Sequence, residues 1–320
     1  MLIPVLLFIV GLVLLIKGGD WFVDGATDIA RRFHIPEIIV GATVVSIGTT
    51  LPEVMVSSIG AYNGQSAMAY GNAIGSIICN TALISAITIT AKPGPVNVKA
   101  LKMPVIFFFI SAIFFSVTAY TTGEFTRPIG LIFLAIFLIY MFLTVREGFK
   151  NPQPQAEETE KDEDSLGKAL LLLIGGAAVI AVGAKLLVDN GTLIARALGV
   201  PETVIALTFV ALGTSLPELV TAITSLMKGH GSLSLGNVIG ANIFNLVLVS
   251  GLSITIAPFH LPEAAQLFGH NASLVLDLPV MLAVMAIMTL PALARKKLSR
   301  VQGIILLCIY AAFCAIQFTM

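Results

Sequence analysis

Two glutamates stand at positions where an ionised acid is costly. Glu53 and Glu218 each follow a proline directly, and each lies near the middle of a long apolar stretch. At the centre of a bilayer an ionised side chain costs ~2.5–3.5 kcal/mol on insertion scales, so two carboxylates need a compensating charge. The histidines are expected in loops, and Lys17 and Lys185 are expected near helix ends. The predicted partner of the glutamates is therefore a cation from solution or a proton.

The residues beside the glutamates supply further oxygen atoms. Pro52 and Pro217 have no N–H, so the carbonyls of Gly48 and Gly213, four residues earlier, lose their helical partners. In a membrane such breaks persist where they are buried in protein or line a polar cavity. The polar side chains near them are those of Thr49, Thr50, Thr214, Ser215, Ser76, Asn80 and Asn245. Carboxylate, carbonyl, hydroxyl and amide oxygens suit Ca²⁺ or Na⁺, and they are poor ligands for Zn²⁺.

These blocks occur twice, at a fixed offset of 165 residues. The segment PEIIVGATVVSIGTTLPEV from Pro36 aligns with PETVIALTFVALGTSLPEL from Pro201, with 9 identities in 19 positions. The segment GNAIGSIICN from Gly71 aligns with GNVIGANIFN from Gly236, with 6 identities in 10. The offset indicates an internal duplication, either for function or for packing alone. Its repeated glycines predict close helix approach at Gly71, Gly75, Gly236 and Gly240.

The composition excludes a water-soluble globule. The 320 residues are 57% hydrophobic and 11% charged, whereas soluble chains average about 25% charged residues. Eighteen basic residues balance 18 acidic ones, so the basic stripe that nucleic-acid binding needs is missing. Cys79, Cys308 and Cys314 lie in apolar segments, which favours small buried hydrophobic residues over disulfides or metal ligands.

The apolar runs predict an all-α polytopic membrane protein. A helix needs about 20 apolar residues to cross a bilayer. Ten runs fit, at about 2–23, 37–62, 68–91, 103–122, 127–146, 168–189, 202–227, 231–257, 272–291 and 301–319. We predict a first five-helix repeat at 1–146, an acidic cytoplasmic linker at 147–167 and a second repeat at 168–320. Five spans is an odd number, so the second repeat must be inverted, which is typical of secondary transporters.

The basic residues predict the orientation. With both termini outside, 14 loop Lys and Arg residues face the cytoplasm, and only Arg127 and Arg196 lie outside. The first span has no basic residue before Lys17, so it is not expected to be a cleaved signal peptide. We therefore predict a multi-pass protein of the plasma membrane. Asp20 is expected near a helix end, either solvated or paired with Lys185.

The motifs GTTLPE, GTSLPE, GNAIGSIICN and GNVIGANIFN resemble those of prokaryotic sodium/calcium exchangers of the cation/calcium antiporter superfamily. The resemblance covers nearly the whole chain outside the linker. It implies ion sites in a central diamond formed by spans 2, 3, 7 and 8, with spans 1 and 6 sliding against this core to switch access.

The resemblance also implies roles for individual residues. Glu53 and Glu218 would be the central calcium ligands, together with the backbone oxygens of Thr49 and Thr214. The other implied positions are the flanking sodium ligands, from the side chains of Thr50, Ser215 and Ser76 and the carbonyls of Ser46 and Ala211, and the bordering amides of Asn80 and Asn245.

Two departures from the family pattern, and the absence of one motif of the proton-coupled branch, bear on ion coupling. Ala241 stands where many relatives have Ser, which leaves the number of sodium ions open. Asn245 stands where the potassium-dependent branch has Asp, which makes potassium coupling less favoured. The GNxxE pattern of the proton-coupled branch is absent from the glutamate-bearing helices.

The expected function is antiport of Ca²⁺ for Na⁺ by alternating access, with the lipid bilayer as surroundings and no cofactor or obligatory protein partner. Cation/proton exchange, in which the two glutamates load protons, is the main alternative. A passive channel would be excluded by saturable counterflow. An enzyme is not expected, because the spans contain no HExxH motif or Ser/His pair for hydrolysis. Replacement of Asp162 in the linker by Asn is expected to have little effect on transport.

Overall fold

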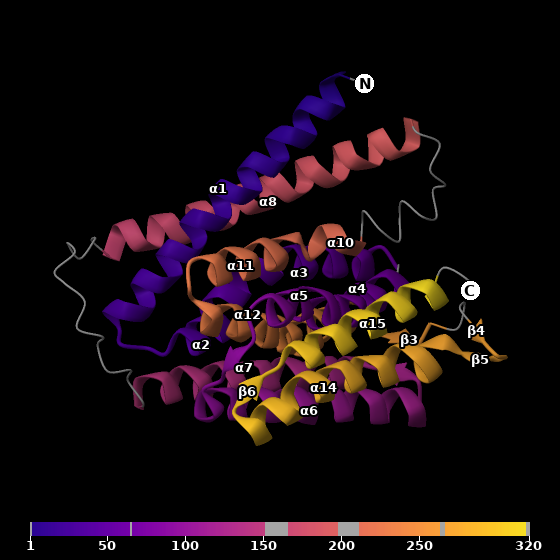
Figure 1. Ribbon diagram of the computed structural model, residues 1–320. Helices are drawn as coiled ribbons and strands as arrows, with labels where there is room; N and C mark the ends of the chain where they lie inside the picture. Colours follow the sequence, from indigo (N-terminus) through magenta and orange to yellow (C-terminus); the bar gives the residue numbers. More distant parts are fainter. Residues whose placement is uncertain (1, 65, 151–165, 198–210, 263–265, 318–320) are drawn as a thin grey trace.

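The computed structural model describes residues 2–64, 66–150, 166–197, 211–262 and 266–317, and almost all of them are helical (Figure 1). In the first half of the chain, up to residue 150, the elements are α1 Leu2–Arg32, α2 Glu37–Val40, η1 Gly41–Val45, α3 Ser46–Tyr62, α4 Ser66–Cys79, η2 Asn80–Ser85, α5 Ala86–Ala91, β1 Gly94–Pro95, α6 Val98–Thr121, β2 Glu124–Phe125 and α7 Arg127–Lys150. In the second half, from residue 166, they are α8 Leu166–Ala197, α10 Ala211–Thr214, α11 Leu216–Met227, α12 Gly231–Phe244, η4 Asn245–Val249, α13 Ser250–Ile256, β3 Phe259–His260, β4 Gln266–Leu267, β5 His270–Asn271, η5 Ser273–Asp277, α14 Leu278–Arg295, β6 Lys297–Leu298 and α15 Arg300–Gln317.

The predicted membrane spans are confirmed wherever the chain is described in full. Within the described ranges, nine helices are long and apolar enough to cross a bilayer. The predicted seventh span, 202–227, is described only from residue 211, where it contributes the shorter apolar helix α11. Most of the acidic linker also lies outside the described residues, which resume at α8. The total of ten membrane spans and the inversion of the two repeats therefore stay predictions.

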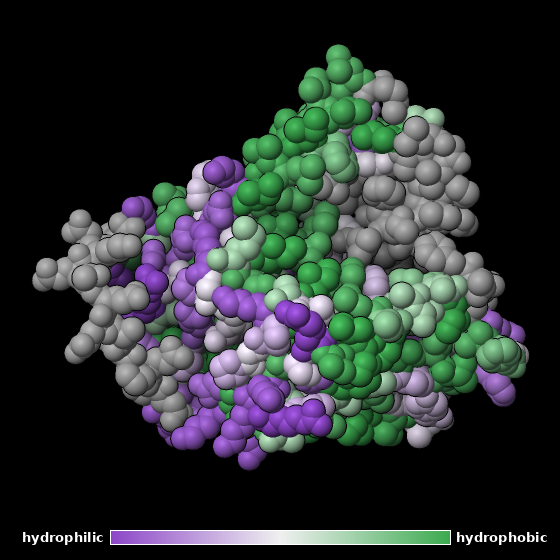
Figure 2. Space-filling view, in the orientation of Figure 1, coloured by the Kyte–Doolittle hydropathy of each residue, from purple (hydrophilic) through white to green (hydrophobic). Residues whose placement is uncertain are grey.

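The segments that carry the repeated motifs form the centre of the molecule. In the most apolar part of Ala69–Ala91 and of Gly231–Ile256, 78% of the residues are buried, against 17% in Arg300–Gln317. Figure 2 shows apolar residues covering the surface over α1 and α15, as lipid-facing helices require, while hydrophilic residues gather toward the end where α2 and β6 lie. Polar residues of the repeats are thus enclosed by apolar helices.

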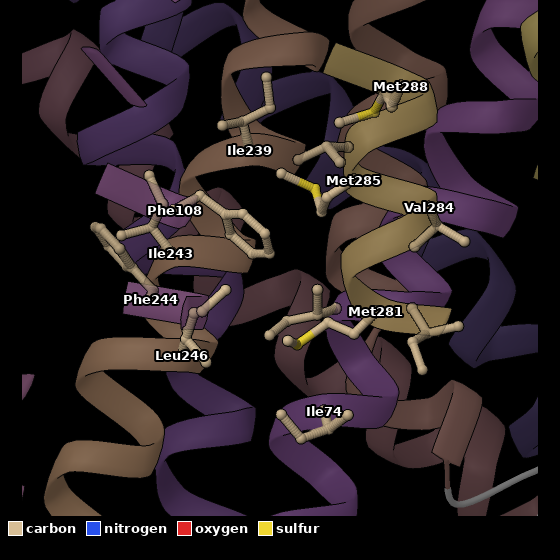
Figure 3. Close-up of a cluster of buried hydrophobic side chains, with 14 of the residues drawn as sticks. Ile74, Phe108, Ile239, Ile243, Phe244, Leu246, Met281, Val284, Met285 and Met288 are labelled. Atoms are coloured by element: carbon tan, nitrogen blue, oxygen red, sulfur yellow. The ribbon is translucent and has the colours of Figure 1, made fainter. Parts of the chain in front are cut away.

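One apolar core contains side chains from both α12 and the second-half helix α14. Met281, Met285 and Met288 of α14 belong to the same cluster as Ile243 and Phe244 of α12 (Figure 3), and all five side chains are fully buried. The flexible methionine side chains fill the irregular space beside the polar helices. Short antiparallel strand pairs also join the halves of the chain, β1 with β6 and β2 with β3.

α1 and α8 form a closely packed pair that lies across the rest of the bundle (Figure 1). A Cβ atom added at Gly176 of α8 would lie 2.5 Å from the backbone nitrogen of Phe22 and 2.9 Å from the carbonyl oxygen of Gly18. A Cβ at Gly183 would lie 2.9 Å from the carbonyl oxygen of Gly11. These four glycines form two pairs at the 165-residue offset, 11 with 176 and 18 with 183. Glycine permits this backbone-to-backbone contact because it has no side chain.

The expected pairing of Asp20 with Lys185 is wrong. Lys185 bonds to Asp189 one turn along α8, at 2.9 Å between Nζ and Oδ2. Asp20 and Asp24 instead face Lys228, whose Nζ lies 2.8 Å from Asp24 Oδ1 and 3.5 Å from Asp20 Oδ1. The first helix continues to Arg32, so these aspartates lie within α1, beside the turn that follows α11.

Candidate ion-binding site

The two glutamates are brought together in the centre of the bundle. Glu53 on α3 and Glu218 on α11 are both 0% exposed, and their carboxylates are close enough to interact electrostatically. Neither oxygen of Glu53 and only one oxygen of Glu218 has a hydrogen-bond partner among the described residues. Burying ionised carboxylates without partners is strongly unfavourable. The arrangement therefore requires a cation or protons in the space between the two side chains.

The helix geometry around the two prolines differs between the halves. α3 continues through Pro52, whereas the second half is interrupted at Ser215, between α10 and α11. Thr50 Oγ1 donates to Glu218 Oε1 at 3.4 Å, which joins the two glutamate-bearing turns. The Ser215 hydroxyl is buried and has no hydrogen-bond partner in the ranges that the structure covers. Its role as a sodium ligand stays a prediction.

Asn80 and Asn245 each begin a π-helical turn, η2 and η4, at equivalent positions of the two repeats. Both side chains are 0% exposed, and neither their amide nitrogens nor their amide oxygens bond to any described residue. η2 contacts α11, and η4 contacts α3. π-Helical turns are frequent at functional sites. Both asparagines therefore border the glutamate-bearing helices with uncommitted polar groups.

The other predicted residues occupy more peripheral positions. Ser76 is buried on α4, one turn before Asn80. The Ser46 hydroxyl donates to the carbonyl of Gly41 at 2.7 Å, inside its own segment, and also to Asn237. Ala211 is the first residue of α10. For Ser46 and Ala211 the predicted ligands are backbone carbonyls, and that prediction remains open.

Sequence reasoning missed two asparagines of the same blocks, Asn72 on α4 and Asn237 on α12. Thr49 Oγ1 donates to Asn237 Oδ1 at 3.1 Å, and Thr214 Oγ1 donates to Asn72 Oδ1 at 3.2 Å. Each bond joins a residue of one half to a residue of the other. The signal was present in the sequence, because both asparagines follow the first glycine of the GN blocks at the same offset.

The predicted close approach of the glycine-containing helices is confirmed in the second half. A Cβ at Gly236 would lie 2.1 Å from the carbonyl oxygen of Ile38, and one at Gly240 would lie 2.3 Å from Ser46 Oγ. No described atom lies within 4 Å of a Cβ built at Gly71 or Gly75. Residues 198–210, which include the start of the predicted seventh span, lie outside the described residues, so the prediction for Gly71 and Gly75 stays open.

A cavity of about 10 Å³ adjoins the site where α1 and α8 cross the two proline turns. Its lining includes Phe22, Thr49, Pro52 and Pro217. This is about the smallest space that holds a water molecule. Across the described residues, no group of three or more His, Cys, Asp or Glu side chains could hold a metal ion. The available ligands are therefore two carboxylates supplemented by neutral oxygens.

Known proteins are similar to this chain in sequence and in fold. Residues 3–146 and 168–319 match the sodium/calcium exchanger protein family. An uncharacterized membrane protein of Methanocaldococcus jannaschii is 34% identical over 95% of this chain and 94% of its own length. The sodium/calcium exchanger MaX1 of Methanosarcina acetivorans is 31% identical over 98% of each chain. A solved structure of the sodium-calcium exchanger NCX_Mj, soaked with 2.5 mM Na⁺ and 0.1 mM Sr²⁺, superposes with a TM-score of 0.84 at 34% identity, over 98% of both chains. The chain therefore belongs to the sodium/calcium exchanger family.

Proposed function

We propose that this protein exchanges Ca²⁺ for Na⁺ across the plasma membrane, as a secondary active antiporter rather than an enzyme. The observation that carries the proposal is the pair of fully buried glutamates, with buried hydroxyl and amide groups near them that have few hydrogen-bond partners. An all-oxygen set is suited to calcium and sodium. Membership of the exchanger family supports the same pair of ions.

The residues divide into a centre and its flanks. In the centre, Glu53 and Glu218 bind Ca²⁺ with the backbone carbonyls of Thr49 and Thr214. The proposed flanking sodium ligands are the side chains of Thr50, Ser215 and Ser76 and the carbonyls of Ser46 and Ala211, and the amides of Asn80 and Asn245 border both regions. The burial of the described hydroxyls and amides supports these roles, because buried polar groups need partners.

Charge makes the exchange obligatory. Two ionised glutamates in a low-dielectric gate are costly to move unless their charge is compensated. One Ca²⁺ or two or more Na⁺ ions provide this compensation, so the switch between access states requires a loaded site. Calcium then leaves as sodium enters down its gradient. A ratio above two Na⁺ per Ca²⁺ would make the exchange electrogenic.

The α1/α8 pair is the element that we propose moves. Its helices contact each other through glycines, and it meets the core at the cavity beside Thr49. Movement of this pair across α3 and α11 would expose the site to alternate sides of the membrane. An inverted relation between the two repeats, with both termini outside, is consistent with such a mechanism.

Calcium uptake into reconstituted vesicles tests the proposed function. We expect uptake of radiolabelled Ca²⁺ when vesicles loaded with Na⁺ are diluted into sodium-free buffer, because sodium efflux then drives calcium entry. Equal gradients of K⁺ or H⁺ in place of Na⁺ should give no uptake above the control without protein. Uptake driven by a pH gradient and indifferent to sodium would contradict the proposal and favour cation/proton exchange. Uptake without saturable counterflow would indicate a channel.

A further inference from the structure

The hydrogen bonds of Thr49 and Thr214 reach from each half of the chain to the other. Thr49 of α3 bonds to Asn237 of α12, and Thr214 of α10 bonds to Asn72 of α4. Thr49 and Thr214 are separated by 165 residues, and so are Asn72 and Asn237, so the two bonds join equivalent residues of the two repeats. Two matching bonds with the same donor type, the same acceptor type and nearly the same length indicate a common role in both repeats.

Each threonine lies one helical turn before a glutamate, four residues before Glu53 or Glu218. When its hydroxyl donates to an asparagine, the hydroxyl proton is committed to that amide, and the side chain holds the turn against the opposite half of the chain. The side-chain bond therefore holds one side of the turn that carries the threonine. The threonine carbonyl and the carboxylate of the following glutamate are the groups that bind the ion in the proposed site. A hydrogen bond of this kind, between the two halves of the chain, also limits how far apart the halves can lie.

The asparagines are themselves held in place. Asn72 Nδ2 donates to Ser57 Oγ at 2.8 Å and to the carbonyl oxygen of Glu53 at 3.3 Å, so its amide connects the turns of both glutamates. Asn237 is 0% exposed, and its Oδ1 also accepts from Ser46 Oγ at 3.3 Å. The Asn72 amide is thus held by α3 on one side and bonds to α10 on the other, whereas Asn237 is held through Oδ1 alone, because its Nδ2 has no partner among the described residues.

We propose that Asn72 and Asn237 are positioning residues for ion binding, each of which orients the threonine carbonyl of the opposite half. They act through Thr214 and Thr49 and do not themselves contact the ion. This inference rests on the proposed function, because it assigns a role to residues beside the proposed calcium site. Loss of either bond lets the corresponding turn rotate, which weakens binding without removing a ligand.

Double-mutant cycles on calcium affinity test the proposal. The Kd for Ca²⁺ is measured by titration calorimetry on the purified full chain in lipid nanodiscs. We expect Asn72→Ala, Thr214→Val, Asn237→Ala and Thr49→Val each to raise the Kd about 3- to 10-fold, the effect of losing one hydrogen bond. The matched doubles, Asn72→Ala with Thr214→Val and Asn237→Ala with Thr49→Val, should resemble the more affected single variant, because each pair removes the same bond.

The mismatched doubles supply the internal control. Asn72→Ala with Thr49→Val, and Asn237→Ala with Thr214→Val, remove two different bonds, so their fold-changes should multiply. Asn190→Ala removes a buried asparagine of α8 and should leave the Kd unchanged, because its described bond is to the carbonyl of Leu186 within the same helix. Matched doubles whose fold-changes multiply would overturn the proposal.

The threonine variants keep the test decisive if an asparagine variant misfolds. Thr214→Ser and Thr49→Ser retain the hydroxyl, so they should raise the Kd less than the corresponding Val variants; equal effects of Ser and Val would overturn the proposal. Wild-type protein that binds Ca²⁺ but shows no sodium-driven uptake would contradict the exchange function, while the cycles would still decide the positioning role. Absence of calcium binding by wild-type protein would overturn both.

Discussion

Replacement of either glutamate by glutamine should abolish sodium-driven calcium uptake. Glu53→Gln and Glu218→Gln preserve the size of the side chain but remove one of the two buried carboxylates that interact electrostatically. Interactions with a charged group are worth about 1.5–3 kcal/mol each, so calcium affinity should fall about 10- to 100-fold even before any effect on the transport cycle. With one carboxylate left, a single Na⁺ compensates the site and a Ca²⁺ overcompensates it, so coupled exchange should fall below detection in vesicles.

The control for this prediction is the same chemical change at an exposed position. Glu124 lies in β2 and is exposed, so Glu124→Gln should transport as wild type does. Both glutamine variants at the site should remain folded, because an uncharged amide is less costly to bury than a carboxylate. Normal sodium-dependent uptake by Glu218→Gln, at equal protein incorporation, would refute the assignment of the site.

A single methyl group at Gly176 should disrupt the α1/α8 pair. The Cβ of Gly176→Ala would lie 2.5 Å from the backbone nitrogen of Phe22. That neighbour is backbone, so the helices must separate, and overpacking of this kind costs about 1–3 kcal/mol. We expect a lower thermal unfolding temperature in detergent, measured by fluorescence-detected size exclusion after heating. Calcium uptake should also be reduced, because the pair that we propose moves would no longer pack as a unit.

The neighbouring glycine provides a matched control for this substitution. No described atom lies within 4 Å of a Cβ at Gly175, which is on the same helix. Both substitutions raise helix propensity equally, so that contribution cancels between them. Gly175→Ala should therefore have wild-type stability and uptake. If the two variants were equally stable, close backbone contact at Gly176 would not be what holds α1 against α8.

The span pattern and the identity of the central acids could be predicted from the sequence because the bilayer imposes strong local constraints. A helix that crosses it needs about 20 apolar residues, and an acid at that depth is unusual enough to identify a site. Glu53 and Glu218 were found in this way. The pairing of Asp20 was predicted incorrectly, because the ammonium group of Lys228 comes from a turn about 200 residues away in the chain.

Composition, spacing and the 165-residue offset are properties of the chain alone, so the repeated residues, the apolar segments and the available oxygen types follow from them without a structure. Tertiary structure decided how those oxygens are used. Thr49 and Thr214 each carry a hydroxyl and a carbonyl, and the hydroxyl protons are donated to Asn237 and Asn72 of the opposite half. Asn80 and Asn245, with the same amide group, are left without partners among the described residues. This difference arises because a hydrogen bond depends on distance and direction, which only the packing of the two halves against each other sets.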